Sequence, residues 1–206
     1  MPVSGVILAA GSSVRMGQPK QLLRVGGHTF IDLVIDAALG SGLSEVSVVL
    51  GAYAEQVRRS IRAAESERLR IVVNEEHARG VSTSLRCGLA ACSPSSEGAA
   101  ILLADQPGID STLIDSMLAA FATRRAPIVR PVFQGADGTA VPGHPVLLAR
   151  SVWPLLETLD GDEGARALIA RHPDLLETID VPTGAPRDVD TMDDYRRVCA
   201  TAVVER

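Results

Sequence analysis

The sequence predicts an α/β protein in which a mostly parallel, mixed sheet lies between two layers of helices. Short apolar runs rich in valine, isoleucine and leucine alternate with stretches of helical length in the first half of the chain. Turn-forming residues bound these runs, as is usual for strands buried on both faces. The 206 residues are 46% hydrophobic and 22% charged, a composition that fits one globular domain with a sizeable core.

The first half of the chain contains four runs that we expect to be buried strands. They are Val3–Ala10, Val46–Leu50, Leu69–Val73 and Ala99–Leu103. Stretches between and after them have the length and spacing of helices. These are Phe30–Leu39, Ala54–Ala64, Ser82–Ala91 and Ser111–Thr123. Strands that alternate with helices favour a parallel sheet covered on both faces.

The second half is less regular, and a mixed α+β region is expected there. The predicted strands are Pro127–Val132, Pro145–Leu148 and Leu175–Val181, the predicted helices are Val152–Leu159 and Glu163–Arg171, and the predicted Gly-rich loop is Gln134–His144. A last helix is expected after Thr191, with Asp193 and Asp194 in its first turn, where acidic side chains are favourable. No clear linker divides the chain, so residues 1–206 are expected to form one domain.

Charge and composition argue against several classes of protein. The net charge is −5, which does not suit a nucleic-acid-binding surface. The run Val6–Ala10 is too short for a signal peptide or a membrane span, so a cytoplasmic protein without membrane contact is expected. Cys87, Cys92 and Cys199 lack the spacing of metal ligands and are expected to be reduced thiols.

The first predicted strand runs directly into the loop Gly11–Lys20, whose sequence is GSSVRMGQPK. Ligands of open α/β sheets bind at the carboxyl ends of strands, and glycines let backbone N–H groups turn toward an anion. Ser12 and Ser13 add hydroxyl donors, and Arg15 and Lys20 add positive charge for phosphate oxygens. The alternative is a plain glycine turn with solvated charges, which the joint presence of arginine, glycine and lysine disfavours.

Two common phosphate-binding templates do not match this loop. A P-loop has its lysine directly after the second glycine, whereas Gln18 and Pro19 intervene here. A dinucleotide fingerprint has glycines at its first, third and sixth places, and Ser13 occupies the third. The loop therefore argues against P-loop kinases and dinucleotide-dependent dehydrogenases.

The segment LAAGSSVRMGQPKQLL, residues 8–23, resembles the signature L-A-x-G-x-S-x-R-M-G-x-x-K of the nucleotidyltransferases that attach CMP or GMP to molybdopterin. More broadly it is similar to sugar-phosphate nucleotidyltransferases with a Rossmann-like, glycosyltransferase-A-like fold. The nucleotide-binding residues that the resemblance implies here are Leu8, Ala9, Ala10, Gly11, Ser12, Ser13, Arg15 and Lys20, with Arg15 and Lys20 also catalytic. Ala10 indicates the cytidylyltransferase branch, because glycine is usual there in the guanylyltransferase branch, so CTP is expected and GTP is the alternative.

Two aspartates are implied to hold Mg²⁺. Asp105 follows the fourth predicted strand in a D-Q-P turn, where the family places a metal-binding, catalytic aspartate. The segment DVDTMDDY, residues 188–195, resembles the family's D-[IV]-D-T-P-E-D-[LY] element, with mild departures at Met192 and Asp193. Asp190 is thereby implied as the second metal ligand, with Asp188 as a possible substitute. A strand-end turn at Asp105 and a helix cap at Thr191 are the structural alternatives.

Three later segments resemble further family elements. Gly80, Ser82 and Ser84 lie in a G-x-x-x-S-[LI] loop that is implied to approach the base and ribose, although a serine cap for the following helix explains them equally well. Gly143 and His144, in a G-H-P motif, are implied to bind the acceptor. Arg166, in the G-D-E-G-A-R motif of residues 161–166, is implied to bind the acceptor's phosphate. The other histidines, His28, His77 and His172, have no supporting context.

The resemblance implies a Mg²⁺-dependent transfer of a nucleotide, CMP from CTP, to the terminal phosphate of molybdopterin, with release of pyrophosphate. Residues 1–110 are expected to bind the nucleotide and residues 111–206 the acceptor. A molybdenum hydroxylase is a candidate recipient of the product. The alternatives are guanylyl transfer, another small phosphorylated acceptor, a non-catalytic nucleotide-binding chaperone for the cofactor, and an oxidoreductase, which the absent dinucleotide fingerprint disfavours.

Overall fold

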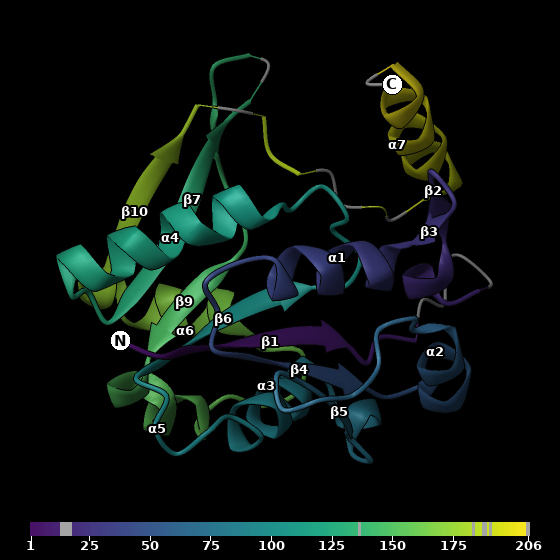
Figure 1. The fold of residues 1–206 in the computed structure, drawn as a ribbon. Helices are drawn as coiled ribbons and strands as arrows, with labels where there is room; N and C mark the ends of the chain where they lie inside the picture. Colours follow the sequence, from purple (N-terminus) through teal and green to yellow (C-terminus); the bar gives the residue numbers. More distant parts are fainter. Residues whose placement is uncertain (13–17, 136, 183, 187–188, 190, 205–206) are drawn as a thin grey trace.

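The computed structural model describes residues 1–12, 18–135, 137–182, 184–186, 189 and 191–204 (Figure 1). The strands of its main sheet are β1 (Val3–Ala9), β4 (Glu45–Leu50), β5 (Leu69–Val73), β6 (Gly98–Leu103), β7 (Ile128–Gln134), β8 (Ala140–Pro142), β9 (Val146–Ala149) and β10 (Leu176–Val181). Their order is β10-β7-β9-β6-β1-β4-β5, with β8 paired to β7. Strands from both halves of the chain therefore share one sheet.

Most neighbouring strands of this sheet are parallel. β1 pairs in parallel with β4 and β6, β4 with β5, and β7 with β10. β9 is antiparallel to both of its neighbours, β6 and β7, and β8 is antiparallel to β7. Since β9 reverses direction between them, β6 and β7 run the same way. The predicted mostly parallel, mixed sheet is confirmed.

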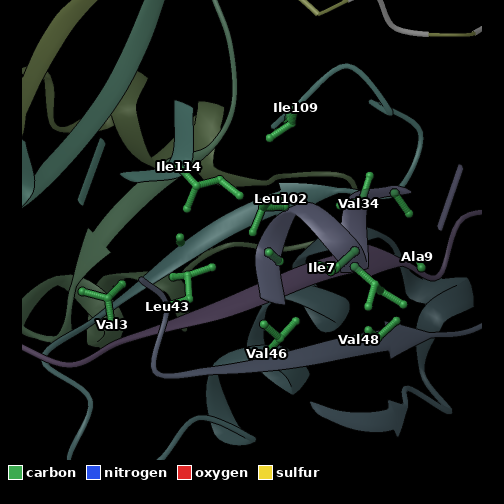
Figure 2. Close-up of a cluster of buried hydrophobic side chains, with 14 of the residues drawn as sticks. Val3, Ile7, Ala9, Val34, Leu43, Val46, Val48, Leu102, Ile109 and Ile114 are labelled. Carbon is green, nitrogen blue, oxygen red and sulfur yellow. The ribbon is translucent and has the colours of Figure 1, made fainter. Parts of the chain in front are cut away.

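Helices cover both faces of the sheet, as predicted (Figure 1). The helices are α1 (Phe30–Leu39), α2 (Ala54–Ser60), α3 (Val81–Ala90), α4 (Ser111–Arg124), α5 (Trp153–Leu156), α6 (Ala165–Arg171) and α7 (Met192–Val204). The buried side chains of α1 and α4 join one hydrophobic cluster, and those of α3, α5 and α6 join another on the opposite face. The first cluster packs around the central strands, where Ile7, Val48 and Leu102 are fully buried (Figure 2).

Side-chain caps fix where several helices begin. The Thr29 hydroxyl accepts a hydrogen bond from the Asp32 backbone N–H at 3.2 Å, which starts α1. Before α7, the Asp194 N–H donates to the Thr191 hydroxyl at 3.2 Å, and the Thr191 N–H donates to the Asp194 carboxylate at 2.9 Å. This reciprocal pair satisfies two backbone donors of the first turn. The predicted cap at Thr191 and the acidic first turn of α7 are both confirmed.

The structure differs from the sequence-based prediction in a few elements. α2 ends at Ser60 rather than Ala64, because Ile61 takes an extended conformation. The helix predicted over 152–159 is shorter: a 3-10 turn, Arg150–Val152, precedes α5. The loop expected over 134–144 contains β8. An unpredicted hairpin, β2 (Arg24–Val25) and β3 (His28–Thr29), turns through Gly26 and Gly27, whose φ angles are 59° and 88°.

The sheet topology brings the ends of several strands to one edge. Because β1, β4, β5 and β6 are parallel, their carboxyl ends lie together, and so do the loops that follow them. Within the described ranges, no helix is long and apolar enough to cross a membrane.

Candidate functional site

A cavity of about 650 Å³ lies at the carboxyl ends of β1 and β6. Four segments that are distant in sequence contribute to its wall. The lining residues are Leu8, Ala10, Gly11, Ser12, Lys20, Gln21, His77, Ala78, Gly80, Val81, Ser84, Leu103, Ala104, Asp105 and Asp162. The structure thus brings together most of the residues that were predicted to bind the nucleotide.

The first predicted strand and the loop after it supply one side of this cavity. Leu8, Ala10, Gly11 and Ser12 line it, whereas Ala9 is 4% exposed and packs into the core. The difference follows from the geometry of a strand, in which successive side chains point to opposite faces. The predicted residues Ser13 and Arg15 lie outside the described residues.

Lys20 and Asp105 meet at the wall of the cavity. The Lys20 Nζ atom lies 3.7 Å from a carboxylate oxygen of Asp105, and their side chains are 14% and 32% exposed. Lys20 begins a 3-10 turn, Lys20–Leu22, and Asp105 follows β6. Lys20 is also the chain's only lysine among many arginines. A compact ammonium and a carboxylate therefore face the same space, in which a phosphate and its cation would each find an opposite charge.

Gln21 is a site residue that the sequence analysis missed. Its side-chain amide donates to the backbone carbonyls of Ala9, at 2.9 Å, and Gly11, at 3.3 Å. These bonds tie the turn after Lys20 to the start of the first loop. The sequence shows only a polar residue beside the apolar pair Leu22–Leu23, whereas the structure indicates the role, because this side chain is only 5% exposed and hydrogen-bonded.

The segment from Gly80 to Ser84 forms another side of the cavity and contacts the second half of the chain. Gly80 has a φ of 112°, and a Cβ added to it would lie 2.1 Å from the carbonyl carbon of Gly161. The backbone N–H of Ser82 donates to the Gly161 carbonyl at 3.1 Å. This contact places the loop that carries Asp162 beside the segment from Gly80 to Ser84.

The predicted serines of this segment differ in position. Ser84 lines the cavity and accepts a hydrogen bond from the Asn74 side chain at 2.9 Å. Ser82 is 1% exposed and does not line the cavity, and its hydroxyl has no partner in the described part of the chain. The residue at the start of α3 is Gly80, with no side-chain cap. The alternative that a serine caps this helix is therefore wrong.

Two further cavity residues depart from the sequence-based interpretation. His77, which had no predicted role, lines the cavity from the 3-10 turn His77–Arg79. Asp162 belongs to the motif interpreted as acceptor-binding, yet it lines the same cavity as Lys20 and Asp105. Both residues reach the cavity through tertiary contacts of their loops, which sequence spacing does not reveal.

The predicted acceptor residues Gly143, His144 and Arg166 do not line this cavity. Gly143 follows β8, and its N–H donates to the Pro131 carbonyl of β7 at 3.0 Å. The His144–Pro145 peptide bond is cis. Arg166 is exposed in the first turn of α6. Gly143 therefore lies beside β7, and Arg166 lies on α6.

The described residues fit part of a divalent metal site. No group of three or more histidine, cysteine, aspartate or glutamate side chains in the described ranges is arranged as a metal cage. Mg²⁺ needs few protein carboxylates where substrate phosphates complete its shell, and Asp105 offers one at the cavity. Asp188 and Asp190 lie outside the described residues. Val189 between them is buried in a cluster with Leu23 and Phe30.

Comparison with known proteins decides the family. Residues 5–175 match the model of the MobA-like NTP transferase domain. The chain belongs to this family. Over 203 residues it is 34% identical to nicotine blue oxidoreductase of Paenarthrobacter nicotinovorans, covering 95% of this chain and 96% of that protein. The MobA-like NTP transferase fold and the resemblance stated from the first loop are therefore confirmed.

Solved structures of similar sequence have the same architecture. A homologue of Mycobacterium tuberculosis Rv0371c from Mycobacterium sp. strain JC1 matches with a TM-score of 0.84 and 35% identity, covering 99% of this chain and 98% of that one. Rv0371c from M. tuberculosis in complex with manganese matches with a TM-score of 0.79 and 30% identity, covering 97% and 98%. The Rossmann-like, glycosyltransferase-A-like nucleotidyltransferase fold thus extends along the chain.

Proposed function

We propose that this MobA-like nucleotidyltransferase transfers CMP from CTP to the terminal phosphate of a molybdopterin-type acceptor and releases pyrophosphate. The observation that carries the proposal is the meeting of Lys20 and Asp105 at a cavity that the first loop also lines. A volume of about 650 Å³ suits a small-molecule ligand.

The cavity wall offers complementary groups for a triphosphate. Backbone N–H groups at Gly11 and Ser12 are proposed to contact phosphate oxygens, and Ser84 to contact the nucleoside. Lys20 is proposed to neutralise charge that grows on the departing pyrophosphate, together with Arg15. Ala10 borders the nucleoside in this arrangement, which supports CTP by resemblance and leaves GTP as the alternative donor.

A divalent cation completes the proposed site. Asp105 and Asp190 are proposed to hold Mg²⁺, with Asp188 as the substitute for Asp190. Val189, which stands between the two aspartates in the sequence, is buried with Leu23, three residues beyond Lys20, and this contact supports the proposal. Manganese in the related Rv0371c structure supports a divalent ion, so both metals require testing. The bound ion would supply positive charge for the triphosphate.

The proposed reaction needs no covalent enzyme intermediate. An oxygen of the acceptor's terminal phosphate attacks the α-phosphorus of CTP and forms a P–O bond. The bond between the α-phosphorus and the bridging oxygen to the β-phosphorus breaks, and its electron pair leaves with pyrophosphate. The phosphate oxygen is already a nucleophile, so the protein contributes positioning and charge stabilisation.

The two halves of the chain are proposed to divide the substrates between them. Residues 1–110 supply Lys20 and Asp105 for the nucleotide, and residues 111–206 supply Gly143, His144 and Arg166 for the acceptor. Asp162 departs from this division because it reaches the nucleotide cavity. The protein is proposed to act in the cytoplasm, and a molybdenum hydroxylase is proposed to receive the product.

Pyrophosphate release with each of the four nucleoside triphosphates, with and without molybdopterin, tests this proposal. We expect release with CTP, only when molybdopterin and Mg²⁺ or Mn²⁺ are present. Release with GTP and molybdopterin, but not with CTP, would assign the guanylyl alternative. Release only with a different phosphorylated acceptor would replace molybdopterin as the proposed acceptor. A chaperone would bind CTP without releasing pyrophosphate. Redox turnover of nicotine blue without pyrophosphate release would favour the activity that names the P. nicotinovorans relative.

A further inference from the structure

Arg130 lies near the middle of β7, and one nitrogen of its guanidinium group has no hydrogen-bond partner among the described residues. Its side chain is partly buried, and its Nε atom is fully buried without a hydrogen-bond partner in the described part of the chain. An unsatisfied buried donor is costly, more so when it carries charge. A residue in this condition indicates a partner that binds from outside.

The other arginines show how unusual this is. Within the described ranges, arginine side chains otherwise donate to carboxylates or backbone carbonyls, with the exceptions of Arg125, Arg130 and Arg166. Arg125 follows α4 and is exposed, so water can satisfy it. Arg130 therefore stands out because its Nε atom is buried and no described residue accepts a hydrogen bond from it.

The strand register places Arg130 opposite the G-H-P motif. On one side of it, Val132 of β7 pairs with Pro142 of β8. On the other side, Val129 pairs with Leu147 of β9. Residues 143–146 therefore lie opposite only Arg130 and Pro131 of β7. The extra residues make the chain bulge at His144 and Pro145, across from Arg130.

Arg166 brings a second positive charge to the same region. Ile128, which shares a face of β7 with Arg130 by the alternation of a strand, packs in the cluster that contains Leu168 of α6. Arg166 is in the first turn of α6. Burial and, secondly, the positive charge of Arg166 lower the pKa of the Arg130 guanidinium. Two like charges that approach each other without a described carboxylate between them favour an anion there.

We propose that Arg130 and Arg166 form a subsite that binds the phosphate monoester of the acceptor substrate. This inference rests on the proposed function and deepens it, since Arg130 was not among the residues expected to bind the acceptor. A planar guanidinium matches phosphate oxygens in pairs and remains charged at neutral pH. His144 lies across the strand register from Arg130, and Asp162, which lines the nucleotide cavity, precedes Arg166 by four residues.

The test compares Arg130→Met and Arg130→Lys with the matched control Arg125→Met. Loss of a charged hydrogen bond to phosphate predicts that Arg130→Met raises the KM for molybdopterin about 10- to 100-fold, while the KM for CTP changes less than about twofold. Arg130→Lys should recover only part of the loss. The melting temperature of Arg130→Met should equal or exceed that of the wild type, because an unsatisfied charge has been removed.

A second arm keeps the inference testable if no triphosphate is turned over. Inorganic phosphate is added to protein carrying Lys20→Ala, so that the nucleotide cavity contributes little, and the melting temperature is followed. Phosphate should stabilise this protein and the additional Arg125→Met variant, but not the additional Arg130→Met variant. No phosphate effect in the Lys20→Ala protein would overturn the inference. A lower melting temperature for Arg130→Met with equal KM increases for both substrates would also overturn it, by assigning Arg130 a structural role.

Discussion

The ammonium group of Lys20 lies 3.7 Å from the carboxylate of Asp105, although the two residues come from loops after different strands. The parallel pairing of β1 and β6 produces this meeting, because it brings the carboxyl ends of both strands to one edge. Each side chain keeps some exposure to the cavity. A triphosphate with its cation would offer Lys20 a phosphate and Asp105 a metal ion, so the pair is suited to exchange partners on binding.

Removing either member of this pair should slow transfer strongly while leaving the fold intact. We expect Lys20→Ala and Asp105→Ala each to lower kcat/KM for pyrophosphate release by roughly 10²- to 10³-fold, the usual effect of losing one charge-stabilising contact. Lys20→Arg should recover little, since the two cations differ in shape and donor geometry. Circular dichroism and thermal melting check that the variants fold.

The control for this pair is Arg59→Ala, which removes a surface ion pair with Glu55. It should leave both rate and stability nearly unchanged. Wild-type rates of pyrophosphate release in both Lys20→Ala and Asp105→Ala would contradict the assignment.

Gly80 should not tolerate a side chain. A Cβ there would lie 2.1 Å from the carbonyl carbon and 2.2 Å from the carbonyl oxygen of Gly161, and the φ of 112° is itself unfavourable for alanine. We expect Gly80→Ala to lower the free energy of unfolding by at least about 2 kcal/mol and to raise the KM for the triphosphate. Urea denaturation and steady-state kinetics measure the two effects.

Gly138→Ala separates backbone strain from collision. Gly138 also has a positive φ, 79°, but an added Cβ would have no neighbour within 4 Å among the described residues. Its substitution should cost only about 1 kcal/mol and leave the KM unchanged. An equal decrease in the free energy of unfolding in both variants would show that the contact between Gly80 and Gly161 adds nothing to the effect of backbone strain.

The regular elements were largely predictable because buried strands and helices have recognisable apolar patterns in the sequence. α1 and β5 have the predicted bounds, and the main strands and α3, α4 and α6 differ by at most two residues at either end. The hairpin β2–β3 was missed because strands of two residues show no alternation. β8 was missed because its segment is rich in glycine and becomes extended only through its pairing with β7.

The candidate site was predictable where its residues are contiguous. The first loop and Asp105 follow strands directly, so strand order alone indicates their place. Gln21, His77 and Asp162 reach the cavity through side-chain and loop contacts that depend on the complete fold. Arg130 is similar, since only the pairing of β7 with β8 and β9 places it across from His144.

Ala10 offers a test of nucleotide choice. It lines the cavity, whereas Ala9 packs into the core. If the resemblance to the cytidylyltransferase branch extends to function, Ala10→Gly should raise kcat/KM for GTP relative to CTP by about tenfold, equivalent to about 1.4 kcal/mol. Ala9→Gly should change kcat/KM for both triphosphates by the same factor. An unchanged ratio in Ala10→Gly would remove Ala10 as a determinant.

Cys92 should make stability fall at alkaline pH. Burial raises the pKa of its thiol from 9.0 to about 11 in the folded protein. The unfolded chain therefore loses this proton at lower pH than the folded chain, and the stabilisation present below pH 9 is lost as the pH rises from 9 to about 11. The loss should amount to roughly 2–3 kcal/mol.

Urea denaturation of the wild type and Cys92→Ala between pH 8 and about 11 measures this effect. As the pH rises across that range, the free energy of unfolding of the wild type should fall relative to that of Cys92→Ala. Parallel pH curves would mean that the thiol does not resist ionisation in the fold.

Phosphorus NMR of one reaction mixture tests the central claim most directly. The mixture contains the protein, CTP, molybdopterin and Mg²⁺, with Asp105→Ala run alongside. The proposed transfer predicts that the acceptor's phosphate monoester signal disappears while signals of a new diphosphate linkage and of pyrophosphate appear together, with no change in the Asp105→Ala sample. Unchanged CTP and acceptor signals with active wild-type protein, under conditions in which CTP is shown to bind, would contradict nucleotidyl transfer to this acceptor.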